Sequence, residues 1–160
     1  MRILTKVVLS TESNKSLERV RRALGNKSYQ TVLGTATKKV NSLAQLSLEA
    51  YQSKVPIDSG ELRGNIQRTT ATPQSGLSEV FIDGPHTSVT RVLASKYGEI
   101  KQSDVLAEIL DIGIKGVKGR FKRTRDSLTT GVFSTVSAGT DTKGWISKAR
   151  QAFGQARRKV

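Results

Sequence analysis

The sequence contains no cysteine, only three prolines and one histidine, and aromatic residues make up 5% of its 160 residues. Without cysteine the chain forms no disulfide and no thiolate-ligated metal site, although the redox compartment stays open. A single histidine leaves no second imidazole for a zinc site. No apolar run approaches the roughly 20 residues that a membrane-spanning helix needs. The few aromatics are not interleaved with basic residues, which disfavours single-strand binding by base stacking.

The apolar segment at the start of the chain is short. Residues 1–10 are too few for a signal peptide, and no small-residue cleavage site follows them. We therefore expect an edge strand there. A chain of 160 residues can bury one modest core, so we expect a single domain over residues 1–160.

Positive charge is what the sequence has in excess. It contains 27 lysines and arginines against 13 aspartates and glutamates, which gives a formal net charge of +14. Such a charge indicates a polyanionic neighbour, usually nucleic acid, or a protein whose lysines keep it dispersed. Both interpretations stay open at this point.

Part of this charge is concentrated in one Gly-rich segment. Residues 113–126 have almost no apolar pattern, and we expect a mobile basic loop over residues 114–126. The basic side chains of this loop would bind nucleic-acid phosphates without sequence specificity, or bind an acidic protein surface, or remain solvated. The six basic residues are Lys115, Lys118, Arg120, Lys122, Arg123 and Arg125.

Helical periodicity dominates the first third of the chain. Leu17, Val20 and Leu24 predict a short helix that stops at Gly25. Residues 28–55 predict a long helix with one apolar stripe, which we expect to face the core. The stripe consists of Leu33, Ala36, Val40, Leu43, Ala44, Leu48, Tyr51 and Val55.

Two strand patterns follow, separated by turn residues. Residues 65–71 and 77–83 predict a β-hairpin, and the Thr-Pro-Gln-Ser-Gly segment between them is typical of its turn. In the second strand Val80 and Ile82 alternate with Glu79, Phe81 and Asp83, and we expect a mainly polar outer face.

The rest of the chain predicts a helix over residues 104–112, a strand over 131–136 and a closing helix over 144–159. On the first of these helices the residues expected to share a side are Val105, Leu106, Ile109 and Ile112. On the closing helix the residues expected to face inward are Trp145, Ile146, Ala149 and Phe153. This order predicts an α+β fold, with a long N-terminal helix and a C-terminal helix packed on a small antiparallel β-sheet and joined by extended loops.

The joint between the long helix and the hairpin is the most specific segment. Pro56 ends the preceding helix, and Asp58 with Glu61 has the spacing of a capping box for a new helical turn. Leu62 and Ile66, four residues apart, would point to one side of it. The two carboxylates also have the spacing of a general acid and base, but capping explains both without a reaction.

Other candidates for chemistry are weaker. His86 follows a proline in a loop, and we expect it at the surface. The Gly113-x-x-Gly116-x-x-Gly119 spacing differs from both common phosphate-binding loops. No nucleophile with an orienting base is recognisable, so we expect no enzyme, no cofactor and no metal.

Residues 55–66 contain the pattern Pro-x-Asp-Ser-Gly-x-Leu-Arg-x-x-Ile. This pattern resembles the signature of the tailed-bacteriophage neck or tail-completion proteins, called tail terminators, and in particular the lambdoid gene-product-ten-like group. Residues 106–113 and 144–149 are similar to the two downstream motifs of that family, in the same order. The resemblance covers about residues 28–153, with 1–27 as an N-terminal extension and 85–103 as an insertion. The residues that match as structural or interface positions are Pro56, Asp58, Gly60, Leu62, Arg63, Ala107, Asp111 and Gly113.

The resemblance implies a structural virion protein, made in the host cytoplasm and located at the head–tail junction. It implies a homo-hexameric ring that completes the tail tube, binds the head-completion protein and surrounds the genomic double-stranded DNA, with no membrane partner. The six basic residues would then line the DNA channel or contact a partner. The alternative is a small basic protein that binds nucleic acid without sequence specificity, although no helix-turn-helix, zinc-finger or RNA-binding signature is present.

Overall fold

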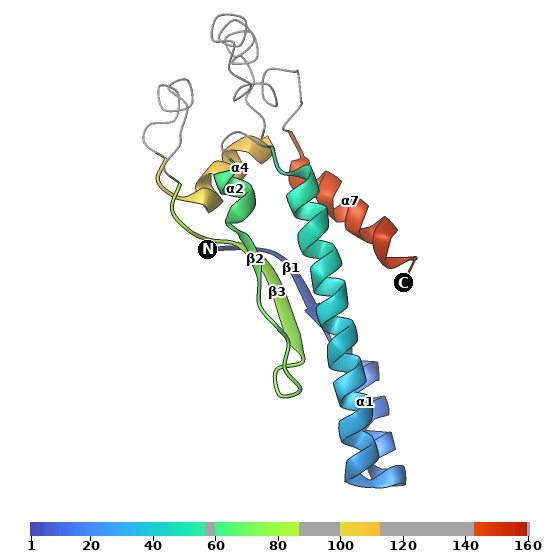
Figure 1. The fold of residues 1–160 in the computed structure, drawn as a ribbon. Coiled ribbons are helices and arrows are strands. Elements are labelled where there is room, and N and C mark those ends of the chain that lie inside the picture. Colours follow the sequence, from blue (N-terminus) through green and yellow to red (C-terminus); the bar gives the residue numbers. More distant parts are fainter. Residues whose placement is uncertain (57–59, 87–99, 113–142, 160) are drawn as a thin grey trace, which may run out of the picture.

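The computed structural model describes residues 1–56, 60–86, 100–112 and 143–159 (Figure 1). These residues form an α+β fold in which two helices pack on a small antiparallel sheet, as the sequence predicts. The predicted strand at 131–136 and the segment at 87–99 lie outside the described residues. The elements are β1 (Arg2–Val8), α1 (Thr11–Lys54), α2 (Glu61–Gly64), β2 (Ile66–Arg68), β3 (Leu77–Ile82), α4 (Ser103–Ile112) and α7 (Trp145–Arg157).

The sheet has three strands in the order β1-β3-β2, and both pairs are antiparallel. The predicted hairpin is therefore confirmed, and so is the edge strand at the N-terminus. Along β3 the side chains of Val80 and Ile82 are buried and face α1, whereas Glu79 and Phe81 are only partly buried. This alternation is the one expected of a strand with one face against a core.

Helix α1 consists of two helices across a kink at Gly25. There the backbone is non-helical, with φ of 81° and ψ of 178°, which glycine adopts readily. We call residues 11–24 the arm and residues 26–54 the long segment. Ser10 caps the arm, because its hydroxyl accepts a bond of 3.1 Å from the Ser13 amide. Both predicted helices and the stop at Gly25 are confirmed, and the arm turns back beside the long segment (Figure 1).

The long segment packs on the sheet, and α7 packs beside the long segment (Figure 1). Most of the predicted apolar stripe of the long segment is buried, including Val40, Ala44, Tyr51 and Val55. Leu48 packs partly buried against the same core. The predicted inward face of α7 is also confirmed, since Trp145, Ile146 and Ala149 are buried and Phe153 partly so.

Tyr51 joins three elements at the centre of this core. Its ring meets that of Trp145 edge to face, with centroids 6.3 Å apart and planes at 85°. Its hydroxyl donates to the carbonyl of Leu4 at 3.2 Å and lies 2.9 Å from the hydroxyl of Thr5. The β1–β3 register shifts between Ile3 and Thr5, so Leu4 sits at a bulge. Leu4 has no partner residue on β3 in this register, and its carbonyl accepts the hydrogen bond from Tyr51 instead.

Helix α4 occupies its predicted residues, but only two of the four residues expected to share a side pack on the core. Leu106 is buried and Ile109 is partly buried against the same cluster, which also contains Ala107 and Leu110. Val105 and Ile112 instead are exposed, at 49% and 67%. Because the acids of α4 leave a broad apolar side, its sequence does not identify the part of that side that packs on the core.

Replacing Tyr51 with Phe is expected to lower the free energy of unfolding by about 1–2 kcal/mol, because the hydroxyl contacts are lost while the ring packing stays. Urea unfolding followed by circular dichroism measures this change. Tyr29→Phe is the matched control: no bond to its hydroxyl is recorded within the described residues, and a change below about 0.5 kcal/mol is expected. Equal losses in the two variants would contradict the role of the Tyr51 hydroxyl.

Candidate assembly interface

The joint after α1 ends in a glycine-dependent turn. Gly60 occupies the N-cap position of α2 with φ of 84°, and it makes no side-chain cap. A residue with a Cβ is strained at this φ, which accounts for the glycine. The structure begins α2 at Glu61. Asp58, the other residue of the predicted capping box, lies outside the described residues, so the box stays a prediction.

Glu61 contacts the one histidine of the chain. The Nδ1 of His86 lies 3.4 Å from Oε2 of Glu61, and the histidine is 5% exposed. The His86 amide also donates to the carbonyl of Lys101 at 2.8 Å. The prediction of a surface histidine is wrong, because His86 is buried and its imidazole lies against Glu61 of α2.

The other residues of the first motif divide between the core and the surface. Pro56 and Leu62 are buried, and Ile66 packs with Leu62 in the same cluster, as their spacing predicts. Arg63 is exposed, and no hydrogen bond or ion pair is recorded for its guanidinium within the part of the chain that the structure describes. Arg63 is thus the residue of this motif whose side chain is exposed in the described part of the chain.

Asn65 fastens the joint to the start of α4. Its side-chain amide donates to the Pro85 carbonyl at 2.8 Å and to the Ser103 hydroxyl at 2.6 Å. Gly84 lies directly against it with φ of 123°, where a Cβ would come within 3.0 Å of the Asn65 side chain. This contact explains why position 84 is a glycine.

The second and third motifs meet in the structure. The buried Ala107 accepts a bond of 3.1 Å from the indole of Trp145 at its carbonyl. The Asp111 carboxylate accepts a bond of 2.9 Å from the Ile146 amide and so caps α7, while its carbonyl accepts the Gly144 amide at 2.8 Å. Gly113 and the six basic residues from Lys115 to Arg125 lie outside the described residues. Ala107 and Asp111 therefore hold α4 and α7 together.

The N-terminal amine binds two acids at the same end of the molecule. It lies 2.9 Å from Oδ2 of Asp104 and 3.3 Å from Oδ1 of Asp83. The bond to Asp104 raises the pKa of the Met1 amine, and the same bond lowers the pKa of Asp104. Because the pKa of Asp104 is lowered, its ionised carboxylate stabilises the fold at pH values above its ordinary pKa of 3.8. This stabilisation is lost as the pH falls through the pKa of the folded state.

Positive charge is unevenly distributed over the described structure. Residues 11–40, which include the arm, contain seven lysines or arginines and two acids. Residues 143–159 contain six basic residues and no acid. The end around α2 and α4 holds more acids, but Asp83 and Asp104 pair with the Met1 amine and Glu108 pairs with Arg2. The molecule thus has a basic arm end and a basic helix α7 along one side (Figure 1).

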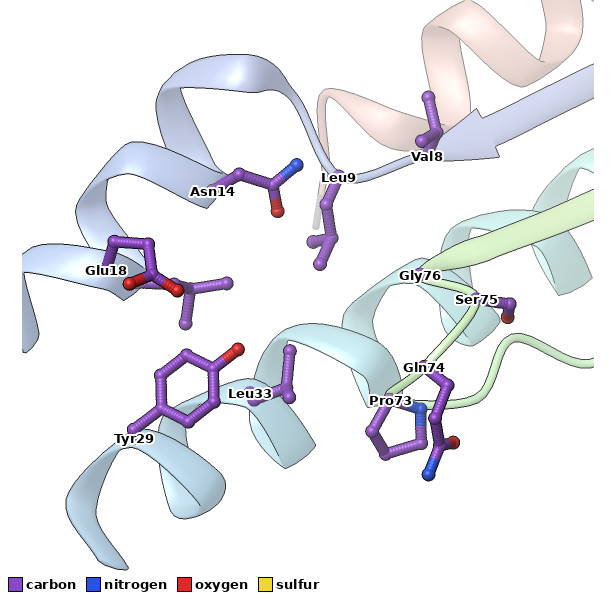
Figure 2. A pocket seen from close by; sticks show the side chains of 11 residues that line it. Val8, Leu9, Asn14, Glu18, Tyr29, Leu33, Pro73, Gln74, Ser75 and Gly76 are labelled. Atoms are coloured by element: carbon purple, nitrogen blue, oxygen red, sulfur yellow. The ribbon is translucent and has the colours of Figure 1, made fainter. Parts of the chain in front are cut away.

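Two hollows flank the arm where it leaves β1. The smaller, of about 260 Å³, is lined by Asn14 and Glu18 of the arm, Tyr29 and Leu33 of the long segment, and residues 73–76 of the turn (Figure 2). The larger, of about 670 Å³, lies between the end of β1, the arm and the long segment, and we call it the groove. Its apolar lining consists of Val7, Val8, Leu9, Leu17, Val20, Val32, Ala36, Val40 and Leu43.

Neither hollow holds a recognisable set of catalytic groups. In the smaller one Glu18 pairs with Arg21 at 3.5 Å, and neither histidine nor a second acid lines it. Within the described residues no group of three or more His, Asp or Glu side chains is placed to hold a metal ion.

In comparisons with known proteins, the chain matches no family model, no curated protein and no solved structure. In the described part of the chain no helix is both long enough and apolar enough to cross a membrane.

Replacing Asp111 with Ala is expected to lower the free energy of unfolding by about 1 kcal/mol, because the first turn of α7 loses its cap. Asp111→Asn keeps an acceptor oxygen, and its free energy of unfolding is expected to fall by less than half of that amount. Urea titration measures the free energy of unfolding of both variants. Glu108→Ala, three residues earlier on the same helix, is the matched control, and its exposed pair with Arg2 is worth less than about 1 kcal/mol. An Asp111→Ala protein as stable as the parent would exclude the capping role.

Proposed function

We propose that the chain is a structural protein of the neck of a tailed bacteriophage. In this role it completes the tail tube and joins it to the head-completion protein as a ring around the double-stranded DNA, six-fold as in the family it resembles. It acts by assembly and catalyses no reaction.

The observation that carries the proposal is the convergence of the three motif segments. Residues 55–66, 106–112 and 144–149 are far apart in the sequence, yet their apolar side chains enter one core cluster. Segments of one family pattern are expected to pack on one another, and these three segments do. The shared residues are Val55, Leu62, Ile66, Leu106, Ala107, Leu110, Trp145, Ile146 and Ala149.

The charge distribution gives independent support for a polyanionic neighbour. Residues 11–40 contain seven basic residues against two acids, and residues 143–159 contain six and none. The surplus of positive charge on α7 is compatible with a neighbouring polyanion such as DNA.

The purified chain is expected to form a homo-oligomer of defined mass when it is mixed with the tail-tube and head-completion proteins of the same phage. Native mass spectrometry measures the mass, and electron microscopy of the mixture shows whether the tube ends are capped. The matched control is the same mixture without this chain, in which the ends stay open. A chain that remains monomeric with both partners present would contradict the proposal.

The alternative function is non-specific binding of nucleic acid, and one observation favours it. Helix α7 and its flanks contain six basic residues without an acid, and three of them, Arg157, Arg158 and Lys159, are exposed side by side at its end. Charges presented in this way bind phosphates irrespective of sequence.

A duplex DNA titration at several salt concentrations separates the two functions. If the chain is a DNA-binding protein, changing Arg157, Arg158 and Lys159 to Gln lowers affinity and reduces the salt slope by about 0.9 per lost phosphate contact. The matched control changes Arg19, Arg21 and Arg22 of the arm to Gln, which removes the same charge elsewhere. As a neck protein, the chain is expected to bind DNA weakly and independently of duplex length. Tight binding that only the α7 variant loses would favour the alternative.

A further inference from the structure

The sheet has two outer edges, because β1 and β2 are its outer strands. In an antiparallel pair, alternate residues direct their backbone N–H and C=O groups toward the partner strand, and the residues between them direct these groups outward. An outward row of such groups without partners is a template that another strand can join. The two edges of this sheet differ in whether that row is already bonded.

The edge at β2 is covered by side chains of the long segment. The Thr69 amide donates across to β3 at 2.9 Å, so Thr69 faces β3 and, by alternation, Ile66 directs its backbone groups outward. The Ile66 carbonyl accepts a bond of 3.3 Å from the Gln52 side chain. Farther along, the Asn41 side chain bonds both backbone groups of Ala71, at 2.8 Å and 3.0 Å. A further strand is therefore not expected at this edge.

The edge at β1 has no such cover near the end of the strand. The Leu9 amide donates to the Gly76 carbonyl at 3.3 Å, so Leu9 and, by alternation, Val7 face β3. Lys6 and Val8 therefore direct their backbone groups outward. Among the residues that the structure describes, no hydrogen bond is recorded for the backbone N–H or C=O of either one. Two donors and two acceptors are thus available at this edge.

The open edge spans residues 5–9 and is bounded on both sides. On one side the Leu4 carbonyl accepts bonds from side chains of the long segment and of α7, so an added strand ends there. On the other side the chain turns into the arm after Val8 and Leu9 (Figure 2). The ammonium of Lys6 pairs with the carboxylate of Glu79 on β3 at 2.9 Å, so it lies over the sheet and not across the edge.

The groove lies beside this edge. Val7 and Val8 line it from β1, and Val32, which is 42% exposed, lines it from the long segment. Successive side chains of a strand point to opposite faces of the sheet, so every second side chain of a strand added to β1 points to the face that carries the long segment. The aliphatic lining of the groove suits apolar side chains at those positions.

We propose that β1 accepts a fourth strand from a different protein, an extended segment whose apolar residues, at alternate positions, enter the groove. The backbone groups identify the occupant, because another extended backbone matches outward N–H and C=O groups at the spacing of alternate residues. A second copy of this chain is a poorer match, since its β2 edge is covered and β1 paired with β1 closes as a two-fold dimer. The inference rests on the proposed function, in which the tail-tube or head-completion protein supplies the segment.

Amide hydrogen exchange of the full-length chain, resolved to single residues, tests the strand addition directly. In the chain alone the amides of Lys6 and Val8 are expected to exchange about tenfold faster, or more, than those of Val7 and Leu9, because only the latter two bond to β3. Addition of the tail-tube and head-completion proteins of the same phage is expected to slow the amides of Lys6 and Val8 about tenfold or more.

A proline at the open edge gives a second measurement. Val8→Pro removes one outward N–H, and an edge strand tolerates it because that N–H makes no bond to β3. Its affinity for the partner, measured by titrating the tail-tube and head-completion proteins separately, is expected to fall about tenfold with the lost hydrogen bond. Val8→Thr keeps the N–H and the branched shape, and as the matched control it is expected to bind within about threefold of the parent. Circular dichroism verifies that both variants are folded.

A charge in the groove tests the apolar part of the contact. Val32→Asp changes an exposed position of the long segment, so the fold is retained, and it is expected to weaken binding of the same partner about tenfold because an unpaired carboxylate would meet apolar side chains. Thr35→Asp is the matched control, since Thr35 is exposed on the same helix but does not line the groove. This control is expected to bind like the parent.

The outcomes separate this inference from the proposed function. Assemblies that cap tail tubes while the amides of Lys6 and Val8 still exchange fast would overturn the strand addition and leave the neck role intact. A chain that binds neither partner would overturn both. Slow exchange of these amides in the chain alone, increasing with its concentration, would assign the edge to a second copy and overturn the inference. Slowing by the partner, with losses in Val8→Pro and Val32→Asp but not in their controls, supports it.

Discussion

The position of Tyr51 is the constraint on which the rest of the fold depends. Its ring fixes α7 through Trp145, and its hydroxyl fixes β1 through the bulge at Leu4. Arg150 of α7 reaches the same carbonyl at 3.4 Å, so the strand, the long segment and the last helix share one polar centre inside an apolar core. Because a buried carbonyl without a partner is costly, the bulge and the tyrosine are useful only together.

Much of the fold was predictable from local patterns. The long segment, the hairpin and α7 each have a clear period and clear turn residues, and the structure places them as predicted. The inward side of α4 was not predictable, because Val105 and Leu106 are equally apolar and only tertiary packing selects between them. The burial of His86 was missed because its partner Glu61 is 25 residues away, and no local pattern links them.

The candidate interface was less predictable than the fold. Gly25 predicts the end of a helix. It does not predict that the arm then turns back beside the long segment and lines a groove with it. The pairing of the acids around α2 and α4 with the Met1 amine and Arg2 also appears only in three dimensions, because these residues are far apart in the sequence. Of the matched residues, Leu62 and Ala107 lie in the core, Asp111 binds the start of α7, and Arg63 is exposed.

The bond between the Asp111 carbonyl and the Gly144 amide has a consequence for how such a chain can change over time. It brings the two ends of residues 112–143 together at 2.8 Å, inside contacts that the core already maintains. Asp111 and Gly144 are thus held together by contacts of α4 and α7 themselves. Natural variation in length and charge can therefore accumulate between these two residues while Asp111 and α7 stay in place, and one scaffold can be adapted to different neighbours.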